Sequence, residues 1–159
     1  MKKLLSCALV LALLCVLLPG DAHGEGSCML LVATDPHFIA PGLTDHGLYF
    51  TALTENSDGK LMRYSEEIMD AFLAEAIAQK PEALLLTGDL SFNGALLSHT
   101  ALAAKLRVAE AAGLRIYVLT GNHDLDNPNA ARFSGAEFQR VTPASPEDFR
   151  RIYADFGFD

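Results

Sequence analysis

Three short apolar runs alternate along the chain with longer segments of helical spacing. The runs occupy residues 29–33, 83–86 and 116–119, and polar residues or glycine follow each of them at once. Apolar runs this short, without polar alternation, are typical of strands buried on both faces in a parallel sheet that helices cover. We therefore predict a parallel strand at each of the three positions.

The segment between the first two runs predicts a helix. Its apolar residues recur in pairs every four positions from Ile68 to Ile77, which places them on one helical face. Ser65 is the expected N-cap, two glutamates stand in the first turn, and Pro81 ends the segment. We expect this helix to cover the sheet.

The same criteria predict two further helices. An apolar stripe from Leu102 to Ala109 forms one of them, which Gly113 ends. Ser145 as N-cap and Pro146 at the first helical position open the other. The alternation of strands and helices predicts an α/β fold with a parallel sheet and right-handed crossovers.

Two stretches, 39–63 and 125–144, are interrupted by glycine and proline. We expect them to be long loops over the edge of the sheet at which the strands end. Loops of this length often carry function.

The first 24 residues have the features of a secretory signal peptide. Two lysines precede an apolar run of 15 residues, and small residues precede an expected cleavage site after Gly24. The run is shorter than the about 20 residues that span a bilayer, which favours cleavage over a retained membrane anchor. We predict an exported protein, extracellular or associated with the cell envelope, without a stable membrane span after cleavage. Only Cys28 would then remain, so no internal disulfide could form.

The charge of the chain excludes some partners. It has 20 acidic and 12 basic residues and a net charge of −8. Nucleic-acid duplexes and anionic membrane surfaces require clustered Lys and Arg, so we expect neither as a partner. An acidic protein can still act on phosphates if bound cations supply the local positive charge.

Residues that commonly bind metals follow every predicted strand. They are Asp35 and His37 after the first, Asp89 after the second, and Asn122, His123 and Asp124 after the third. Ligands of open parallel sheets bind at these strand ends, and this donor set suits divalent first-row metals better than a structural zinc site. Each short motif alone matches many unrelated turns by chance. Their succession at three strand ends is what predicts a metal site.

These motifs also resemble a known family. Asp35-x-His37, Gly88-Asp89 and Gly121-Asn122-His123-Asp124, in this order, are similar to the first three motifs of calcineurin-like metallophosphoesterases. Neighbouring residues, among them those at 87–94 and 155–157, resemble exported bacterial members that act as cyclic-nucleotide phosphodiesterases. The resemblance covers essentially all of residues 29–159. It implies a calcineurin-like fold of β-sheet layers flanked by helices.

The resemblance implies a role for each matching residue. Asp35 and His37 would bind one divalent ion, Asp89 would bridge two, and Asn122 would bind the second. The ions would be manganese or iron, with zinc as a third candidate, and a bridging hydroxide would attack the phosphorus. His123 would act as the catalytic residue that stabilises or protonates the leaving oxygen. Whether Asp124 orients His123 is left open.

The chain departs from the family pattern in two places. Phe92-Asn93 stands where many relatives carry Asp-Arg, so Asn93 is expected to contact substrate phosphate weakly instead of the arginine. His99, on the same edge of the sheet, is a second candidate substrate contact. The family also has two further histidine motifs, and no histidine follows His123. We therefore expect residues 25–159 to be the N-terminal portion of a metallophosphoesterase domain, truncated after the third metal motif.

Two hypotheses about function follow. The first is a metal-dependent phosphoester hydrolase of phosphodiesterase type, acting on a small phosphoester or nucleotide. The second is a non-catalytic exported protein that retains part of the site for binding a metal or a partner. An open reading frame continuing to a Gly-His-x-His motif would favour the enzyme, whereas a stop codon after Asp159 would favour the binding protein.

Overall fold

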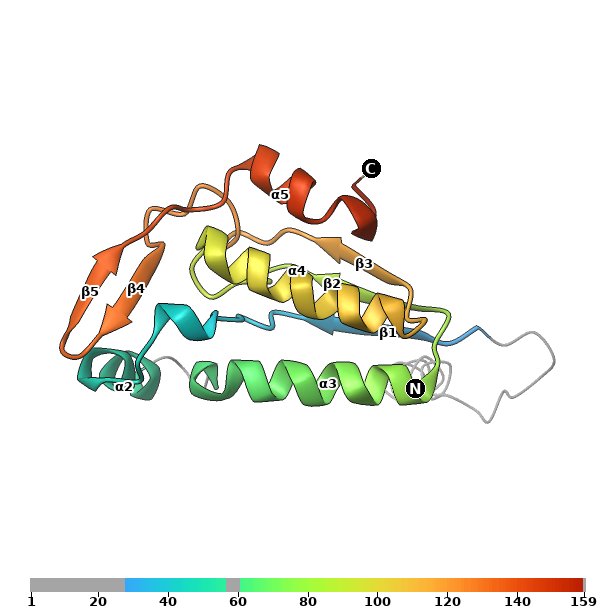
Figure 1. Cartoon of the computed structure of the whole chain (residues 1–159), viewed down its shortest axis with the longest axis horizontal. Coiled ribbons are helices and arrows are strands. Elements are labelled where there is room, and N and C mark those ends of the chain that lie inside the picture. Colours follow the sequence, from blue (N-terminus) through green and yellow to red (C-terminus); the bar gives the residue numbers. More distant parts are fainter. Residues whose placement is uncertain (1–27, 57–60, 159) are drawn as a thin grey trace, which may run out of the picture.

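The computed structural model describes residues 28–56 and 61–158, and a parallel sheet is its central element. The sheet consists of β1 (Leu30–Thr34), β2 (Ala83–Thr87) and β3 (Ile116–Leu119), in that order across its width (Figure 1). Both neighbouring pairs are parallel. The three predicted strands and their direction are confirmed.

Helices occur where the sequence predicts them. α3 (Ser65–Gln79) lies between β1 and β2 in the chain, and α4 (Leu96–Ala111) lies between β2 and β3; the two helices contact each other along the sheet (Figure 1). α5 (Pro146–Ile152) packs against α4. Its capping box begins with Ser145, whose Oγ accepts from the N–H of Asp148 at 3.1 Å. The predicted cap and the α/β architecture are confirmed.

The start of α3 differs from the prediction. Ser65 is the first helical residue rather than the N-cap, and no side chain caps the helix at Tyr64. The Ser65 hydroxyl instead accepts from the backbone N–H of Ile39 at 3.2 Å. A hydroxyl can satisfy a backbone group that is distant in sequence, and here it ties the segment after β1 to α3.

Within the described residues, the sheet is covered on one face only. The side chains of the covered face form the middle of the core and are at most 2% exposed: Leu84, Leu86, Ile116 and Val118. On the opposite face four large side chains are between 46% and 65% exposed: Leu30, Val32, Tyr117 and Leu119. The prediction of strands buried on both faces is therefore wrong for this part of the chain. An apolar run indicates that both faces are apolar, but it does not indicate what covers each of them.

The two stretches predicted to be loops contain regular structure. α2 (Leu48–Glu55) lies in the first, and a hairpin of β4 (Ala131–Ser134) and β5 (Glu137–Arg140) lies in the second. α2 has eight residues, with Gly47 at its N-cap, no capping side chain and no acidic first turn. β5 is exposed throughout. Neither element therefore carries the sequence signals that predict a helix or a buried strand.

Three short 3-10 turns complete the described structure: Pro41–Leu43, Met62–Tyr64 and Ala154–Phe156. None of the helices in the described ranges combines the length and apolar character that a membrane crossing requires. The predicted signal peptide, residues 1–24, lies outside the described residues, so export stays a prediction.

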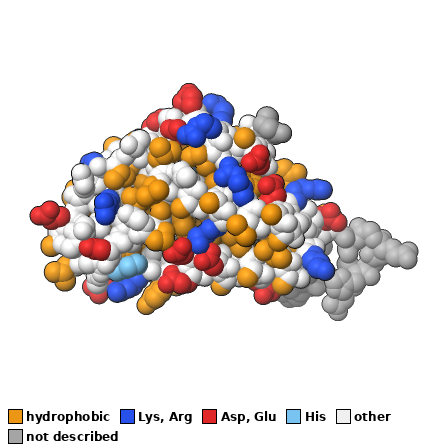
Figure 2. All heavy atoms as spheres, viewed as in Figure 1, with side chains coloured by type: hydrophobic (Ala, Val, Ile, Leu, Met, Phe, Trp, Pro, Cys, Tyr) orange, Lys and Arg blue, Asp and Glu red, His pale blue; other side chains and the backbone are white. Residues whose placement is uncertain are grey.

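Charges are mixed in sign on the face seen in Figure 2. Acidic and basic side chains alternate there with apolar ones, and no large basic patch gathers among the described residues on this face. Between α3 and α4, Lys105 Nζ lies 2.6 Å from Asp70 and 3.1 Å from Glu66. This face therefore lacks the clustered cations that bind a nucleic-acid backbone.

Candidate metal centre

The chain segments that follow β1 and β2 remain paired beyond the ends of the strands. The N–H of Asp35 donates to the carbonyl of Gly88 at 3.3 Å, and that of His37 donates to the carbonyl of Asp89 at 3.0 Å. The φ angles of Asp35, His37 and Asp89 are +53°, +43° and +37°. Non-glycine residues rarely adopt this left-handed region, at a cost of about 1–3 kcal/mol each, and such residues cluster at functional sites.

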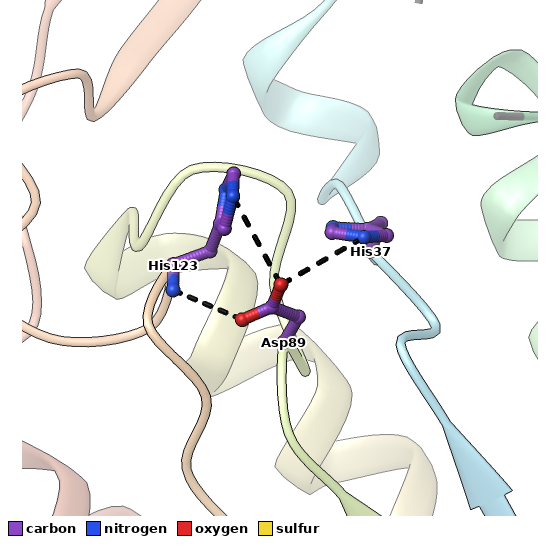
Figure 3. A group of neighbouring side chains, drawn as sticks. All are labelled: His37, Asp89 and His123. Atoms are coloured by element: carbon purple, nitrogen blue, oxygen red, sulfur yellow. Dashed lines mark hydrogen bonds and ion pairs between the residues drawn. The ribbon is translucent and has the colours of Figure 1, made fainter. Parts of the chain in front are cut away.

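His37, Asp89 and His123 come together at the strand ends (Figure 3). One ligand atom from each lies within 4.8 Å of the other two. Oδ2 of Asp89 is 3.9 Å from Nε2 of each histidine, and the two imidazole rings meet edge to face with centroids 5.3 Å apart. The carboxylate therefore stands between two imidazoles, a donor set that suits a divalent first-row metal ion.

Asp35 adds a second carboxylate to this group. Its Oδ1 lies 3.8 Å from Nε2 of His37, the same nitrogen that faces Asp89. Asp35 is half exposed, whereas Asp89 is buried. Asp35 lies outside the group of three within 4.8 Å of one another, but two carboxylates that face one imidazole nitrogen favour a cation nearby, because their like charges repel each other.

Asn122 and His123 occupy the turn after β3. Asn122 is exposed and directly precedes His123. Nδ1 of His123 lies 3.1 Å from the carbonyl of Phe92, and the backbone N–H of His123 donates to Oδ1 of Asp89 at 3.0 Å. A carbonyl only accepts, so Nδ1 carries the proton and Nε2 is directed toward Asp89 with its lone pair.

Gly121 is required by the close approach of this turn to Asp89. A Cβ atom at Gly121 would lie 2.1 Å from the backbone nitrogen of Asp89 and 2.2 Å from its Oδ1. Those distances are far inside van der Waals contact, so any larger residue would displace the carboxylate. The glycine of the Gly-Asn-His-Asp motif thus lets the loops after β2 and β3 touch.

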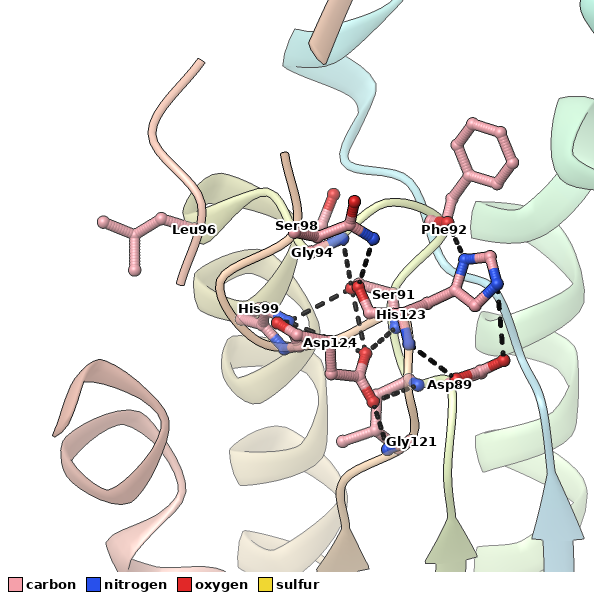
Figure 4. A network of polar contacts seen from close by, with 12 residues as sticks. Asp89, Ser91, Phe92, Gly94, Leu96, Ser98, His99, Gly121, His123 and Asp124 are labelled. Atoms are coloured by element: carbon pink, nitrogen blue, oxygen red, sulfur yellow. Dashed lines mark hydrogen bonds and ion pairs between the residues drawn. The ribbon is translucent and has the colours of Figure 1, made fainter. Parts of the chain in front are cut away.

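The Asp124 carboxylate hydrogen-bonds to the backbone of both loops, the one after β2 and the one after β3 (Figure 4). Its side chain is fully buried, and Oδ2 accepts from the N–H groups of Leu90 at 3.0 Å and Gly121 at 2.8 Å. Oδ1 accepts from the N–H and the hydroxyl of Ser91, at 2.8 and 3.0 Å. These bonds settle the question left open by the sequence, because Asp124 positions the backbone around Asp89 and His123 rather than the imidazole ring.

His99 does not lie where a substrate could reach it, so its prediction as a substrate contact is wrong. It is fully buried, and its Nε2 lies 3.0 Å from the carbonyl of Asp124 and 3.1 Å from Oγ of Ser91. Nδ1 lies 3.1 Å from the hydroxyl of Tyr153. Burial lowers the pKa of His99, while the Asp124 carboxylate opposes that shift; burial also raises the pKa of Tyr153.

The partners of His99 determine its tautomer. The Asp124 carbonyl can only accept, so Nε2 carries the proton and Nδ1 accepts from Tyr153. His99 therefore joins α4 and the residue after α5 to the loop that carries His123. Sequence reasoning missed this network because no single motif contains all its members: His99 and Asp124 are 25 residues apart, and His99 and Tyr153 are 54 apart.

Asn93 is 4% exposed and lies in the wall of a pocket that also includes His123. Its Nδ2 donates to the carbonyl of Ala131 at 3.3 Å. The expected contact with substrate phosphate stays a prediction.

The fold and the cluster together define a class of protein: an α/β protein with a metal-binding site at the strand ends of a parallel sheet. A family model described as calcineurin-like phosphoesterase matches residues 29–157. The chain therefore belongs to the calcineurin-like phosphoesterase family, the metal-dependent hydrolases of phosphoesters, and the resemblance at this level is confirmed. No curated protein matches the chain.

Proposed function

We propose that the protein is a phosphodiesterase that uses two divalent metal ions, manganese or iron, with zinc as a third candidate. The observation that carries the proposal is the convergence of two proposed metal ligands, His37 and Asp89, with the imidazole of His123 at the strand ends, within 4.8 Å of one another. Family membership supplies the reaction class, hydrolysis of a phosphoester. The resemblance to cyclic-nucleotide phosphodiesterases supports the choice of diesters as substrates.

The residues divide into metal ligands and a group that acts on substrate. Asp35 and His37 would hold one ion, Asp89 would contact both, and Asn122 would hold the other. When bound, such ions neutralise phosphoryl oxygens and lower the pKa of water. The carboxylates of Asp35 and Asp89 face the same nitrogen of His37, which supports a cation at this position.

His123 is suited to protonate the leaving group of the substrate. Its imidazole is about one-third exposed and therefore open to substrate. Because Nδ1 is held by the Phe92 carbonyl, Nε2 is the atom that exchanges a proton. Protonated at Nε2, His123 would donate to the departing oxygen, a contribution commonly worth about 10²–10⁴-fold in rate.

The test is the metal dependence and substrate preference of the full-length protein. After treatment with a chelator, hydrolysis of bis-p-nitrophenyl phosphate, p-nitrophenyl phosphate and cyclic AMP would be measured with and without added Mn²⁺. We expect activity to return with the metal and to favour the diesters. Hydrolysis that persists without metal, or a preference for the monoester, would contradict the proposal.

A further inference from the structure

A pocket opens beside His123, between α2, the β4–β5 hairpin and the loop after β2. It encloses about 300 Å³, the lower end of the range for small-molecule sites. His123 belongs to its wall, so the pocket is continuous with the proposed catalytic position. We call it the aromatic pocket, after four of its lining residues: Tyr49, Phe92, Phe133 and Phe138.

The four rings pack against one another and form an aromatic wall of the pocket. Tyr49 and Phe133 are nearly parallel, with centroids 5.8 Å apart, and Phe138 lies 5.2 Å from Tyr49. Phe133 and Phe138 are opposite each other in the hairpin, so both side chains point to the same face. Phe133 is almost buried, whereas Phe138 is 44% exposed. The exposed part of the Phe138 ring is therefore the part of the aromatic wall that a ligand can contact.

Polar groups in the same wall favour a ring with hydrogen-bonding atoms over a plain aryl group. Oδ1 of Asn93 is buried and has no hydrogen-bond partner among the described residues. An unsatisfied buried acceptor in a residue that lines the pocket is a feature that a hydrogen-bond donor of an occupant would explain. The guanidinium of Arg140 lies 5.2 Å from the centre of the Phe138 ring and adds a flat cationic surface.

The Asp45 carboxylate fixes two walls of the pocket, α2 and the hairpin, to each other. Its Oδ2 accepts from the N–H of Gly135 at 2.7 Å, and its Oδ1 accepts from the N–H of Gly47 at 2.8 Å. The N–H of Tyr49 donates to the carbonyl of Gly135 at 2.9 Å. The start of α2 is thereby fixed to the hairpin turn, so Tyr49 and the hairpin rings keep their spacing without a ligand.

We propose that the aromatic pocket binds the nucleobase of a nucleotide phosphoester whose phosphate lies at the His37–Asp89–His123 cluster. The inference rests on the proposed function, because the cluster locates the phosphate. It adds where the base of such a substrate would lie and which residues would contact it.

Binding by the full-length protein would be measured with ligand-observed NMR. In EDTA, adenosine should bind and ribose should not, because ring binding requires no metal. With Mn²⁺ replaced by diamagnetic Zn²⁺, adenosine 5′-monophosphate should bind about 5- to 100-fold more tightly than ribose 5-phosphate, the range expected for stacking of one base.

Phe138→Leu keeps an apolar side chain but removes the ring. It should weaken adenosine 5′-monophosphate about fivefold or more and leave ribose 5-phosphate unchanged. Leu48→Ala is the matched control, since Leu48 is exposed on the same helix as Tyr49 and lies outside the pocket; it should change neither affinity. Absence of adenosine binding, equal affinities for the two phosphates, or an unaffected Phe138→Leu variant would overturn the inference. Adenosine binding without metal-dependent hydrolysis would support the pocket and contradict the proposed function.

Discussion

Replacing Asp124 by Asn would test whether a buried carboxylate holds the loops of the site together. The substitution keeps the shape of the side chain but replaces one oxygen by an NH₂ group. Both oxygens of Asp124 accept two hydrogen bonds each. Whichever way the new amide turns, its NH₂ group replaces one of these oxygens. The two N–H or O–H donors that bond to that oxygen would then face another donor.

The magnitude follows from the bonds that are lost. A hydrogen bond to a charged group contributes about 1.5–3 kcal/mol, so losing two costs about 3–6 kcal/mol. With NH₂ toward Ser91 the hydroxyl offers no relief, because its oxygen already accepts from the N–H of Gly94 at 2.9 Å and lies 3.1 Å from Nε2 of His99. We therefore expect a loss of about 3–6 kcal/mol, which is a large part of the 5–15 kcal/mol typical of a folded domain.

The free energy of unfolding would be measured by urea titration of the full-length protein, followed by circular dichroism at neutral pH. Asp126→Asn is the matched control: Asp126 is exposed, and asparagine tolerates its φ of +46°. The control should change stability by less than about 0.5 kcal/mol. If Asp124→Asn were equally mild, the role of Asp124 in joining the two loops would be wrong.

Three further predictions concern neighbouring parts of the site. Gly121→Ala should reduce the amount of bound Mn²⁺, measured by electron paramagnetic resonance, because the new Cβ would displace Asp89. Gly42→Ala is the control: its Cβ would meet only a flexible side chain at 3.4 Å, so Mn²⁺ binding should not change. His123→Ala should keep the metal but lower turnover about 10²–10⁴-fold, and less for p-nitrophenyl leaving groups, which need no proton; equal losses across leaving groups would exclude the acid role. Hydrogen bonds from the backbone N–H groups of Gly135 and Gly47 lower the pKa of Asp45. The ionised carboxylate therefore stabilises the fold fully above the ordinary pKa of a carboxyl group. This stabilisation is lost as the pH falls through the lowered pKa of Asp45 in the folded protein. Asp45→Asn should therefore destabilise the protein at neutral pH and progressively less in acid, as followed by thermal unfolding.

The sheet and its metal-binding edge could be predicted because their signals are local. Each strand is an apolar run, and its ligands follow within a few residues, so chain order alone brings Asp35, His37 and Asp89 to one edge. His123 arrives there for the same reason. The capping box at the start of α5 could be predicted for the same reason, because it involves only residues 145–148.

The remaining features depend on contacts between distant residues. α2 forms without a capping side chain, and its position depends on Asp45, which binds a hairpin turn about 90 residues later. The burial of His99 depends on Asp124 and Tyr153, which lie 25 and 54 residues away in the chain. A residue type cannot indicate such partners, so the sequence could name His99 as a candidate but could not place it.

The most direct test of the central claim is the number of Mn²⁺ ions bound by the full-length protein and by Asp89→Asn, together with their rates of diester hydrolysis. Asp89 stands between the two imidazoles and is the ligand that both ions would share. We predict that the substitution removes at least one ion per chain and nearly all hydrolysis. A variant that kept two ions and the full rate would contradict the account.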